Sequence, residues 1–420
     1  MNNMKYQAVK GMRDWYPEQK AVLTSIFDVL RTTAQRFGFQ EIESPAIETA
    51  GLLTAKSGEE IKQQLFVFEK KGSEELALRF DLTVPFTRML VQKQGELPKP
   101  VKWFGISRMW RYEAPQKGRL REFYQLSVEL FGCDKPDAEA ECLQLLVACL
   151  KNLGLQEKDF IIRLNNRKLL EGILKNYVRE DKIDEAVRLI DKSCKLNKED
   201  FDFELAKISS QGDMIQQLVS IKGKPSEVLP QLKSLKLNEE ARQGLAELEA
   251  VTDLISLNCL QIDLSLARGL AYYTGTVFEC FDSGQSLRAI AGGGRYDNLV
   301  QLFGGQACAA VGFAIGDVTL SLLLEEKGLL PKSDLKPEYY VCAVSDLVRA
   351  KARELTDKLR RKTIVELDLM NRKFSKQMEI ANNLGVKKTI IVGEEELMQK
   401  KVRIKDMRTG AEELVLIEEL

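Results

Sequence analysis

The most informative absence in this 420-residue sequence is histidine, which does not occur once. Imidazole is the side chain that most often exchanges protons near neutral pH, and it belongs to the Ser-His-Asp triad and to many zinc sites. Sites that need a histidine are therefore excluded. Any chemistry must depend on carboxylates, arginines, lysines, hydroxyl groups and bound ligands.

Closely spaced cysteines are absent as well. The sequence has no Cys-x-x-Cys pair, and most cysteines lie in apolar runs such as LLVACL. This pattern predicts reduced thiols in the protein core, with neither disulfides nor a metal site built from cysteines alone. The cysteines are Cys133, Cys142, Cys149, Cys194, Cys259, Cys280, Cys308 and Cys342.

The sequence also lacks long hydrophobic runs and net charge. No segment approaches the roughly eighteen apolar residues that a membrane span requires, and the start has no apolar signal-peptide core. The 62 Lys and Arg residues balance 62 Asp and Glu residues. We therefore expect a cytoplasmic protein without membrane association, in which local basic patches bind any nucleic-acid partner.

What is present indicates a folded chain of two or three domains of roughly 150 residues each. Apolar residues follow helical spacing over 22–37, and strand-like alternation dominates from about 65 to 131. Helical periodicity with charged linkers occupies about 165–255. After strand signals and a linker with two prolines, strands and helices alternate over about 339–420, which is typical of a separate α/β domain.

The segment FYQLSVELFG alternates as a strand does, so Gln125 and Glu129 lie on one face and Tyr124 and Val128 on the other. The polar face is either a binding surface or the solvent side of an edge strand. The pattern of this segment alone leaves both interpretations open.

The segment ALRFDLT alternates in the same way. A strand there places Arg79, Asp81 and Thr83 on one face. The acid and the hydroxyl group could together bind an ammonium group, whereas a surface ion pair between Arg79 and Asp81 is the alternative.

Positive charge is densest in SRMWRYEAPQKGRLREF. Arginines from a strand and its adjoining loop suit phosphate oxygens, and Phe123 suits stacking on a base, although a solvated basic loop remains the alternative. The cationic residues of this segment are Arg108, Arg111, Lys117, Arg119 and Arg121.

Two later segments complete the candidate chemistry. LARGLAYYTGTVFE places Arg268 close to Tyr272 and Tyr273, a combination that suits an anion or cation–π site, although tyrosine pairs also serve simply as walls. AGGGRYD lets the backbone approach a ligand closely, but it matches neither GxGxxG nor the P-loop. The residues alone predict a pocket for a phosphate and a small cationic or polar ligand.

In chain order, the motifs resemble the histidyl-tRNA synthetase family of class II aminoacyl-tRNA synthetases over essentially the whole sequence. The segments that carry the resemblance are KGMRDWYPEQ, GFQEIESPAIE, WRYEAPQKGRLREFYQ, RGLAYYTGTVFE, GGGRYD and RKFSKQMEIANNLGVKKTIIVGEEEL. RGLAYYTGTVFE together with the WRYE loop belongs to few other proteins.

The resemblance implies an α+β fold in which an antiparallel catalytic sheet of class II type is flanked by helices. It implies the first part of the catalytic core over 1–164, a helical insertion over 165–260, the second part of the core over 261–328, and an α/β anticodon-binding domain over 329–420. The family assembles as a homodimer through its first motif.

Residue roles follow from the resemblance by position. Arg111 corresponds to the arginine that holds the α-phosphate of ATP, and Arg268 to the catalytic arginine that neutralises charge during attack on that phosphate. The implied ATP site consists of Arg111, Glu113, Arg119 and Phe123. The implied histidine site consists of Asp81 and Thr83 at the α-ammonium group, Gln125 and Glu129, Tyr272 and Tyr273 as the wall of the imidazole pocket, and Arg268.

The activity implied is ATP-dependent ligation of L-histidine to histidine tRNA through a histidyl-adenylate, with release of pyrophosphate and AMP. Adenylate formation is an in-line displacement that depends on positioning and charge stabilisation, with Mg²⁺ bridging phosphate oxygens. It requires no protein general base, so it suits a chain without histidine.

The sequence departs from the family pattern in its third motif. GFAIGDVTL has Val318 and Thr319 where the family has an acidic residue and an arginine that holds the γ-phosphate. Arg295 and Lys117 are candidates to replace that arginine.

Two further departures concern Ala271, which replaces an aspartate, and Ala114, which replaces a residue that is commonly basic. They leave open a non-catalytic paralogue: a histidine-sensing regulatory subunit of ATP phosphoribosyltransferase, or an RNA-binding regulator. Retention of the ATP-site residues favours the synthetase, because a regulator has no need of them.

Overall fold

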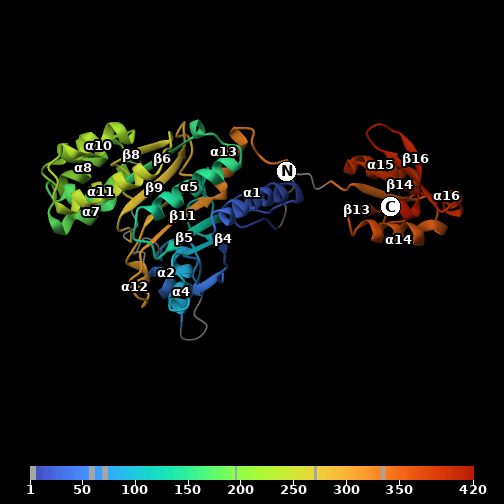
Figure 1. The fold of residues 1–420 in the computed structure, drawn as a ribbon, viewed down its shortest axis with the longest axis horizontal. Coiled ribbons are helices and arrows are strands. Elements are labelled where there is room, and N and C mark those ends of the chain that lie inside the picture. The colour runs from blue at the N-terminus through green and yellow to red at the C-terminus, as the bar shows by residue number, and fades with distance from the viewer. Residues whose placement is uncertain (1–5, 56–61, 69–73, 194–195, 269–271, 333–335) are drawn as a thin grey trace. The chain divides into compact units, whose positions relative to one another are not determined.

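The computed structural model describes residues 6–55, 62–68, 74–193, 196–268, 272–332 and 336–420 (Figure 1). The chain forms two compact units, Met1–Pro331 and Lys332–Leu420. Ala271 and Cys194 lie outside the described residues.

The first unit is built on a nine-stranded sheet. Most neighbouring strands are antiparallel, and the pairs β1–β4 and β6–β8 are parallel. The sheet and its helices confirm the predicted α+β class. In sheet order the strands are β1 (Gln40–Glu41), β4 (Val101–Trp110), β5 (Glu122–Phe131), β11 (Ala310–Gly316), β10 (Ala291–Arg295), β9 (Thr276–Asp282), β6 (Phe160–Asn166), β8 (Leu260–Asp263) and β7 (Lys222–Gly223).

The strand β5 lies inside this sheet, paired with β4 on one side and β11 on the other. Both of its faces are buried from Leu126 to Phe131, and Ser127 and Glu129 are among the buried residues. The edge-strand interpretation of FYQLSVELFG is therefore wrong. A carboxylate held in such a place needs polar partners, because an unpaired buried charge is costly.

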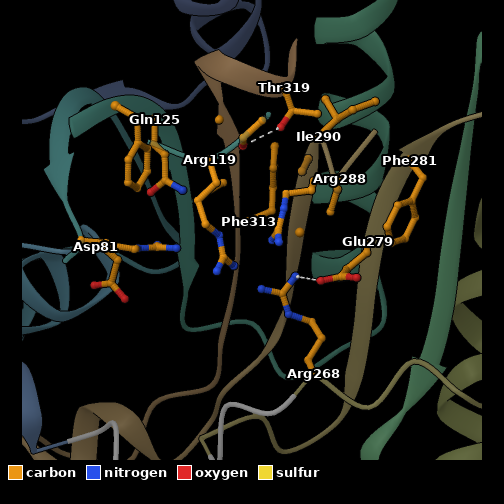
Figure 2. Close-up of a pocket in the computed structure, with 18 of the residues that line it drawn as sticks. Asp81, Arg119, Gln125, Arg268, Glu279, Phe281, Arg288, Ile290, Phe313 and Thr319 are labelled. Carbon is orange, nitrogen blue, oxygen red and sulfur yellow. Dashed lines mark hydrogen bonds and ion pairs between the residues drawn. The ribbon is translucent and has the colours of Figure 1, made fainter. Parts of the chain in front are cut away.

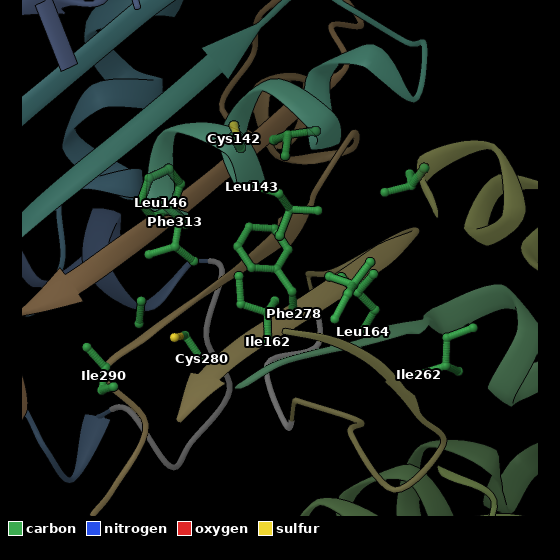
Figure 3. Close-up of a cluster of buried hydrophobic side chains, with 14 of the residues drawn as sticks. Cys142, Leu143, Leu146, Ile162, Leu164, Ile262, Phe278, Cys280, Ile290 and Phe313 are labelled. Atoms are coloured by element: carbon green, nitrogen blue, oxygen red, sulfur yellow. The ribbon is translucent and has the colours of Figure 1, made fainter. Parts of the chain in front are cut away.

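Two long helices cover one face of the sheet: α1 (Pro17–Arg36) and α5 (Asp137–Asn152). Proline suits the first position of a helix, and α1 ends just before Gly38, whose φ is +77°. Apolar residues at helical spacing, such as Leu23 and Leu30, enter the core. Figure 3 shows this core where side chains of α5 meet those of β6, β9 and β11.

The sequence between β6 and β8 forms a group of helices at one end of the unit (Figure 1). The helices α6 and α11 pack so closely at Gly172 that an added Cβ there would lie 2.6 Å from the backbone nitrogen of Ala241. Asn166 caps α6 by accepting from the backbone N–H groups of Lys168 and Leu169. The helices are α6 (Arg167–Leu174), α7 (Ile183–Lys192), α8 (Lys198–Ile208), α9 (Gly212–Val219), α10 (Pro225–Lys233) and α11 (Glu239–Leu254).

The segment ALRFDLT does not form one strand as predicted. The strand β3 (Leu76–Leu78) ends early, and Thr83 is already the first residue of α4 (Thr83–Lys93). Pro85 is the physical reason, since proline fits the first turn of a helix and interrupts a sheet ladder.

The proposed surface pair of Arg79 and Asp81 is also wrong. Arg79 is buried, contacts the carbonyl oxygen of Ser44 and lies 2.9 Å from a carboxylate oxygen of Glu43.

Shorter elements complete the first unit. They are β2 (Ile47–Thr49), paired with β3, and the helices α2 (Ala50–Thr54), α12 (Leu299–Leu302), α13 (Asp317–Glu326), η1 (Glu157–Asp159) and η2 (Glu180–Lys182).

The second unit has its own five-stranded sheet and its own core. Its strand β12 is parallel to β13 and β14, whereas β15 and β16 are antiparallel additions. This is the predicted alternation of strands and helices. In sheet order the strands are β13 (Val365–Leu367), β12 (Tyr339–Ala343), β14 (Lys388–Val392), β15 (Lys401–Asp406) and β16 (Glu412–Leu416), and the helices are α14 (Arg349–Leu359), α15 (Phe374–Leu384), α16 (Glu394–Met398), η4 (Asp346–Val348) and η5 (Ile417–Glu419).

The remaining sequence expectations concern cysteines and membranes. Seven cysteines are described as free thiols; Cys133 is half-buried and the others are buried. Over the described parts of the chain, every helix falls short of the length and apolar character that crossing a bilayer demands.

Candidate active site

A cavity of about 1150 Å³ opens in the first unit, lined by residues of β5, β9, β10 and β11 and of their connecting loops (Figure 2). Ten of the eleven predicted site residues line it. They are Asp81, Thr83, Arg111, Glu113, Arg119, Phe123, Gln125, Arg268, Tyr272 and Tyr273. The eleventh, Glu129, is buried within β5.

The loop between β4 and β5 supplies the cationic side of the cavity. The Nε–H of Arg111 donates to the carbonyl oxygen of Phe80 at 3.1 Å, and its guanidinium lies 5.1 Å from the centre of the Phe123 ring. Burial lowers the pKa of Arg111, while the charge of Glu113 opposes that shift. Arg119 forms an ion pair of 2.9 Å with Glu113. Glu113 thus lies between guanidinium groups that outnumber it, and the excess positive charge favours binding of an anionic ligand.

Glycines of β10 and β11 form a floor that accommodates two charged side chains. An added Cβ at Gly292 would overlap Nη1 of Arg268, and one at Gly312 would overlap Oε2 of Glu129. Gly312 is the register partner of Glu129 on the neighbouring strand. The glycine run therefore provides space for these side chains.

Arg268 crosses this floor and points into the cavity (Figure 2). It pairs with Glu279 at 3.2 Å and lies 5.3 Å from the centre of the Tyr273 ring. Burial lowers its pKa, but Tyr273 and Glu279 outweigh burial, so the net pKa of Arg268 is raised. Its side chain is 17% exposed, so the guanidinium stays charged and partly accessible to a ligand.

Another part of the cavity is a polar pocket walled by tyrosines. Glu129 accepts hydrogen bonds from Thr83 Oγ1 at 2.7 Å and from the Tyr296 hydroxyl group. The rings of Tyr272 and Tyr273 lie 4.5 Å apart, and Tyr272 also contacts the Tyr296 ring edge-on at 5.9 Å. Burial raises the pKa of Tyr272 and of Tyr296, so both phenols keep their protons.

Gln125 offers this pocket an acceptor. Its Oε1 atom is buried without a hydrogen-bond partner among the described residues, while the residue lines the cavity. A buried acceptor of this kind is costly unless a ligand donates to it.

Sequence reasoning missed Tyr296 and Glu279 as members of the site. Both lie in segments that carried the resemblance, Tyr296 two residues after the glycine run and Glu279 at the end of RGLAYYTGTVFE. Glu279 lies on β9 and Tyr296 directly follows β10, the neighbouring strand, and only the pairing of the sheet brings both residues to the cavity.

The first quoted segment, KGMRDWYPEQ, also contributes to the site. The carbonyl oxygen of Gly11 accepts from the backbone N–H of Arg121 at 2.8 Å, and Arg13 pairs with the buried Asp317 at 2.6 Å. Motifs that are about 100 and 300 residues apart thus meet behind the loop that carries Arg119.

A family model described as histidyl-tRNA synthetase matches residues 11–319, and a model described as an anticodon binding domain matches 338–420. The chain belongs to the histidyl-tRNA synthetase family. The suspected resemblance is confirmed.

Curated relatives agree over nearly the whole length. The chain is 41% identical to the histidine--tRNA ligase of Haloarcula marismortui, covering 96% of this chain and 94% of the relative. It is 40% identical to that of Pyrococcus furiosus, covering 99% and 97%.

A solved structure, the histidyl-tRNA synthetase of Nostoc sp. PCC 7120, is similar with a TM-score of 0.79 and 26% identity over 99% of both chains. Another, titled an ATP phosphoribosyltransferase regulatory subunit/histidyl-tRNA synthetase from Bacillus halodurans C, has a TM-score of 0.74 and 26% identity over 90% of this chain and 97% of the other.

The residues that depart from the family pattern have distinct positions. Val318 and Thr319 line the cavity, and Thr319 Oγ1 donates to the carbonyl oxygen of Gly118 at 3.4 Å. Arg295 does not replace the missing arginine, because it forms a buried bidentate pair with Glu139. Lys117 is not among the described residues that line the cavity.

Proposed function

We propose that this protein ligates L-histidine to its tRNA at the expense of ATP, through a histidyl-adenylate. The observation that carries the proposal is the convergence of guanidinium groups and a tyrosine-walled polar pocket in one cavity. The family membership and the names of the curated relatives support it. None of the curated relatives reported above has a regulatory name, so the regulatory alternative gains no support from them.

Histidine occupies the polar end in this proposal. Asp81 and Thr83 receive the α-ammonium group, and the imidazole lies between the tyrosine wall and the acceptors Gln125 and Glu129. An apolar competitor would leave the buried Oε1 atom of Gln125 without a donor, at a cost of roughly 1 to 3 kcal/mol.

ATP occupies the cationic end. Phe123 stacks on the adenine, and Arg111 binds the α-phosphate. An oxygen of the histidine carboxylate attacks the α-phosphorus, the new P–O bond forms as the bond to the bridging oxygen breaks, and pyrophosphate leaves. Arg268 and Arg111 stabilise the negative charge that spreads over the phosphoryl oxygens in the transition state.

The second step transfers histidine to the tRNA. A terminal ribose hydroxyl group of the tRNA attacks the carbonyl carbon of the adenylate, and the bond from that carbon to the phosphate oxygen breaks. AMP leaves with the displaced electron pair, and its phosphate takes up the hydroxyl proton. No side-chain base is required, which agrees with the absence of histidine from the chain.

We also propose that Mg²⁺ enters with ATP. No group of three acidic, cysteine or histidine side chains among the described residues is placed to hold a metal ion. Mg²⁺ usually binds through one or two carboxylates together with substrate phosphates, and Glu113, next to Arg119 in the cavity, suits that arrangement. When bound, the ion neutralises phosphate charge.

The remaining expectations stay predictions. They are a homodimer, a cytoplasmic location, a catalytic core over 1–164 and 261–328, a helical insertion over 165–260, and an anticodon-binding role for 329–420. The match of the anticodon-binding model to 338–420 supports the last of these.

Histidine-dependent exchange of pyrophosphate into ATP tests the proposal. We expect exchange that requires histidine and Mg²⁺, falls strongly in Arg268→Ala and persists in Arg242→Ala, a matched change on the exposed face of α11. Binding of histidine without exchange would reject the synthetase and favour the regulatory alternative. Charging of histidine tRNA then tests the second step.

A further inference from the structure

One arginine in the cavity was not singled out by the sequence. Arg288 lies in the loop between β9 and β10, lines the cavity and is half-buried. Among the described residues, none forms a hydrogen bond or ion pair with its side chain. Such a guanidinium in a cavity is unusual, because its five N–H donors ordinarily find acceptors.

The loop that carries Arg288 is fixed on both sides. The buried carboxylate of Asp282 accepts from the backbone N–H of Leu287 at 2.9 Å, and the N–H of Ile290 donates to the carbonyl oxygen of Cys280 at 2.7 Å. The carbonyl oxygen of Ile290 accepts in turn from the N–H of Gly316. The backbone on both sides of Arg288 is therefore held at the cavity.

Arg288 belongs to a row of guanidinium groups. Figure 2 shows that Arg119, Arg268 and Arg288 point toward the same space. The charge of Arg119 lowers the pKa of both Arg111 and Arg288, so Arg119 lies near each of them. The row consists of Arg111, Arg119 and Arg288, with Arg119 between the other two. The negative charge of Glu113 acts on both Arg111 and Arg288.

Arg288 lies close to Thr319, the position where the family has the arginine that holds the γ-phosphate. An added Cβ at Gly118 would lie 3.5 Å from Thr319 Oγ1 and 3.7 Å from Cδ of Arg288. Both side chains therefore lie against the tip of the same loop. Thr319 Oγ1 donates to the carbonyl oxygen of Gly118 in that loop. Arg288 is the cationic side chain next to Thr319.

We propose that Arg288 binds the terminal phosphate of ATP, at the end of the row opposite Arg111. This inference rests on the proposed function for the identity of the nucleotide. Three guanidinium groups in a row match a bound triphosphate, with Arg111 at the α-phosphate and Arg119 and Arg288 beyond it. Arg288 acts by binding the substrate and the leaving pyrophosphate, and it takes no part in proton transfer.

The test compares nucleotides that differ only in phosphate number. We expect Arg288→Ala to raise the KM for ATP in pyrophosphate exchange by roughly 10- to 100-fold, the loss of a charge-assisted contact, with the KM for histidine unchanged. In calorimetry without histidine, affinity for ATP falls by a similar factor while affinity for AMP is unchanged. Arg288→Lys keeps the charge without the planar fork and recovers part of the loss.

Arg36→Ala, an exposed arginine at the end of α1, is the matched control and leaves all these values unchanged. Equal loss of ATP and AMP binding in Arg288→Ala would assign a structural role and overturn the inference, as would unchanged ATP binding. Absence of exchange in the wild-type protein would reject the proposed function alone, because selective loss of ATP over AMP binding tests Arg288 independently.

Discussion

Glu129 is the residue on which recognition of histidine depends in the proposed site. Thr83 and Tyr296 donate to it, and it is 1% exposed. We expect Glu129→Gln to raise the KM for histidine roughly tenfold or more, because an amide cannot accept from all the groups that the carboxylate serves, while the KM for ATP stays unchanged. Pyrophosphate exchange measures both constants.

The matched control for this change is Glu326→Gln on the exposed surface of α13. It keeps both constants at their wild-type values. A normal KM for histidine in Glu129→Gln would show that the carboxylate only supports the strand.

Gly292 gives a second residue-level prediction. Its added Cβ would overlap Nη1 of Arg268, so Gly292→Ala must displace that guanidinium from the floor. We expect the kcat of pyrophosphate exchange to fall roughly tenfold or more, since a misplaced cation stabilises the transition state poorly. Gly51→Ala in α2, where an added Cβ meets nothing within 4 Å, keeps the wild-type rate. Equal kcat values in both variants would show that the position of the Arg268 guanidinium does not affect catalysis.

Residue types and their order predicted ten of the residues that line the cavity, but they left out others, including Arg288. Arg111 and Phe123 lie on one local segment, so their chemistry could be read together. Arg288 could not be found in this way, because its role depends on Arg119 and Thr319, which the sheet brings together from far along the chain. The roles assigned to the predicted residues remain predictions.

At the level of elements, Cys149 in α5 makes the free energy of unfolding depend on pH. Burial raises the pKa of this thiol from 9.0 to about 12, so it keeps its proton when the thiol of the unfolded chain has lost its own. The native state then binds more protons above about pH 9, and the free energy of unfolding falls as pH rises. From pH 8 to pH 10.5 the loss from this thiol is about 2 kcal/mol.

Urea titrations at the two pH values check this. Cys149→Ala loses less stability than the wild type over that interval, by the amount given above. Val147→Ala on the same helix removes buried volume without an ionisable group and keeps the wild-type pH dependence. Equal slopes for the wild type and Cys149→Ala would show that the native thiol ionises freely.

Elements with a single strong periodicity were predictable, and short mixed ones were not. The apolar spacing of α1 and the alternation of β5 both gave the correct element. ALRFDLT carries the same alternation, yet Pro85 starts a helix there and overrides it. The alternation of β5 also could not reveal its central position, which follows from pairing with β11 about 180 residues later.

At the level of the whole molecule, the first unit alone should form the adenylate, whereas efficient charging of tRNA should need both units. Each has its own sheet and its own core. We expect a protein ending at Pro331 to retain histidine-dependent pyrophosphate exchange, because the cavity lies entirely in the first unit. Charging of histidine tRNA should fall by more than about tenfold, since contacts with anticodon bases are lost.

Full charging by the shortened protein would show that the second unit does not contribute to tRNA recognition. A shortened protein that has lost exchange would show instead that the first unit depends on the second. Thermal unfolding of the shortened protein distinguishes that case from simple misfolding.

The walls of the cavity have one more consequence. Its described lining consists of guanidinium, carboxyl, phenol, amide, hydroxyl and apolar groups. Groups of these kinds ordinarily keep one charge state between about pH 6 and 9. The lining then keeps its charge over this range, so a pH dependence of the proposed reaction would report the ionisation of the substrates, the imidazole of histidine and the terminal phosphate of ATP.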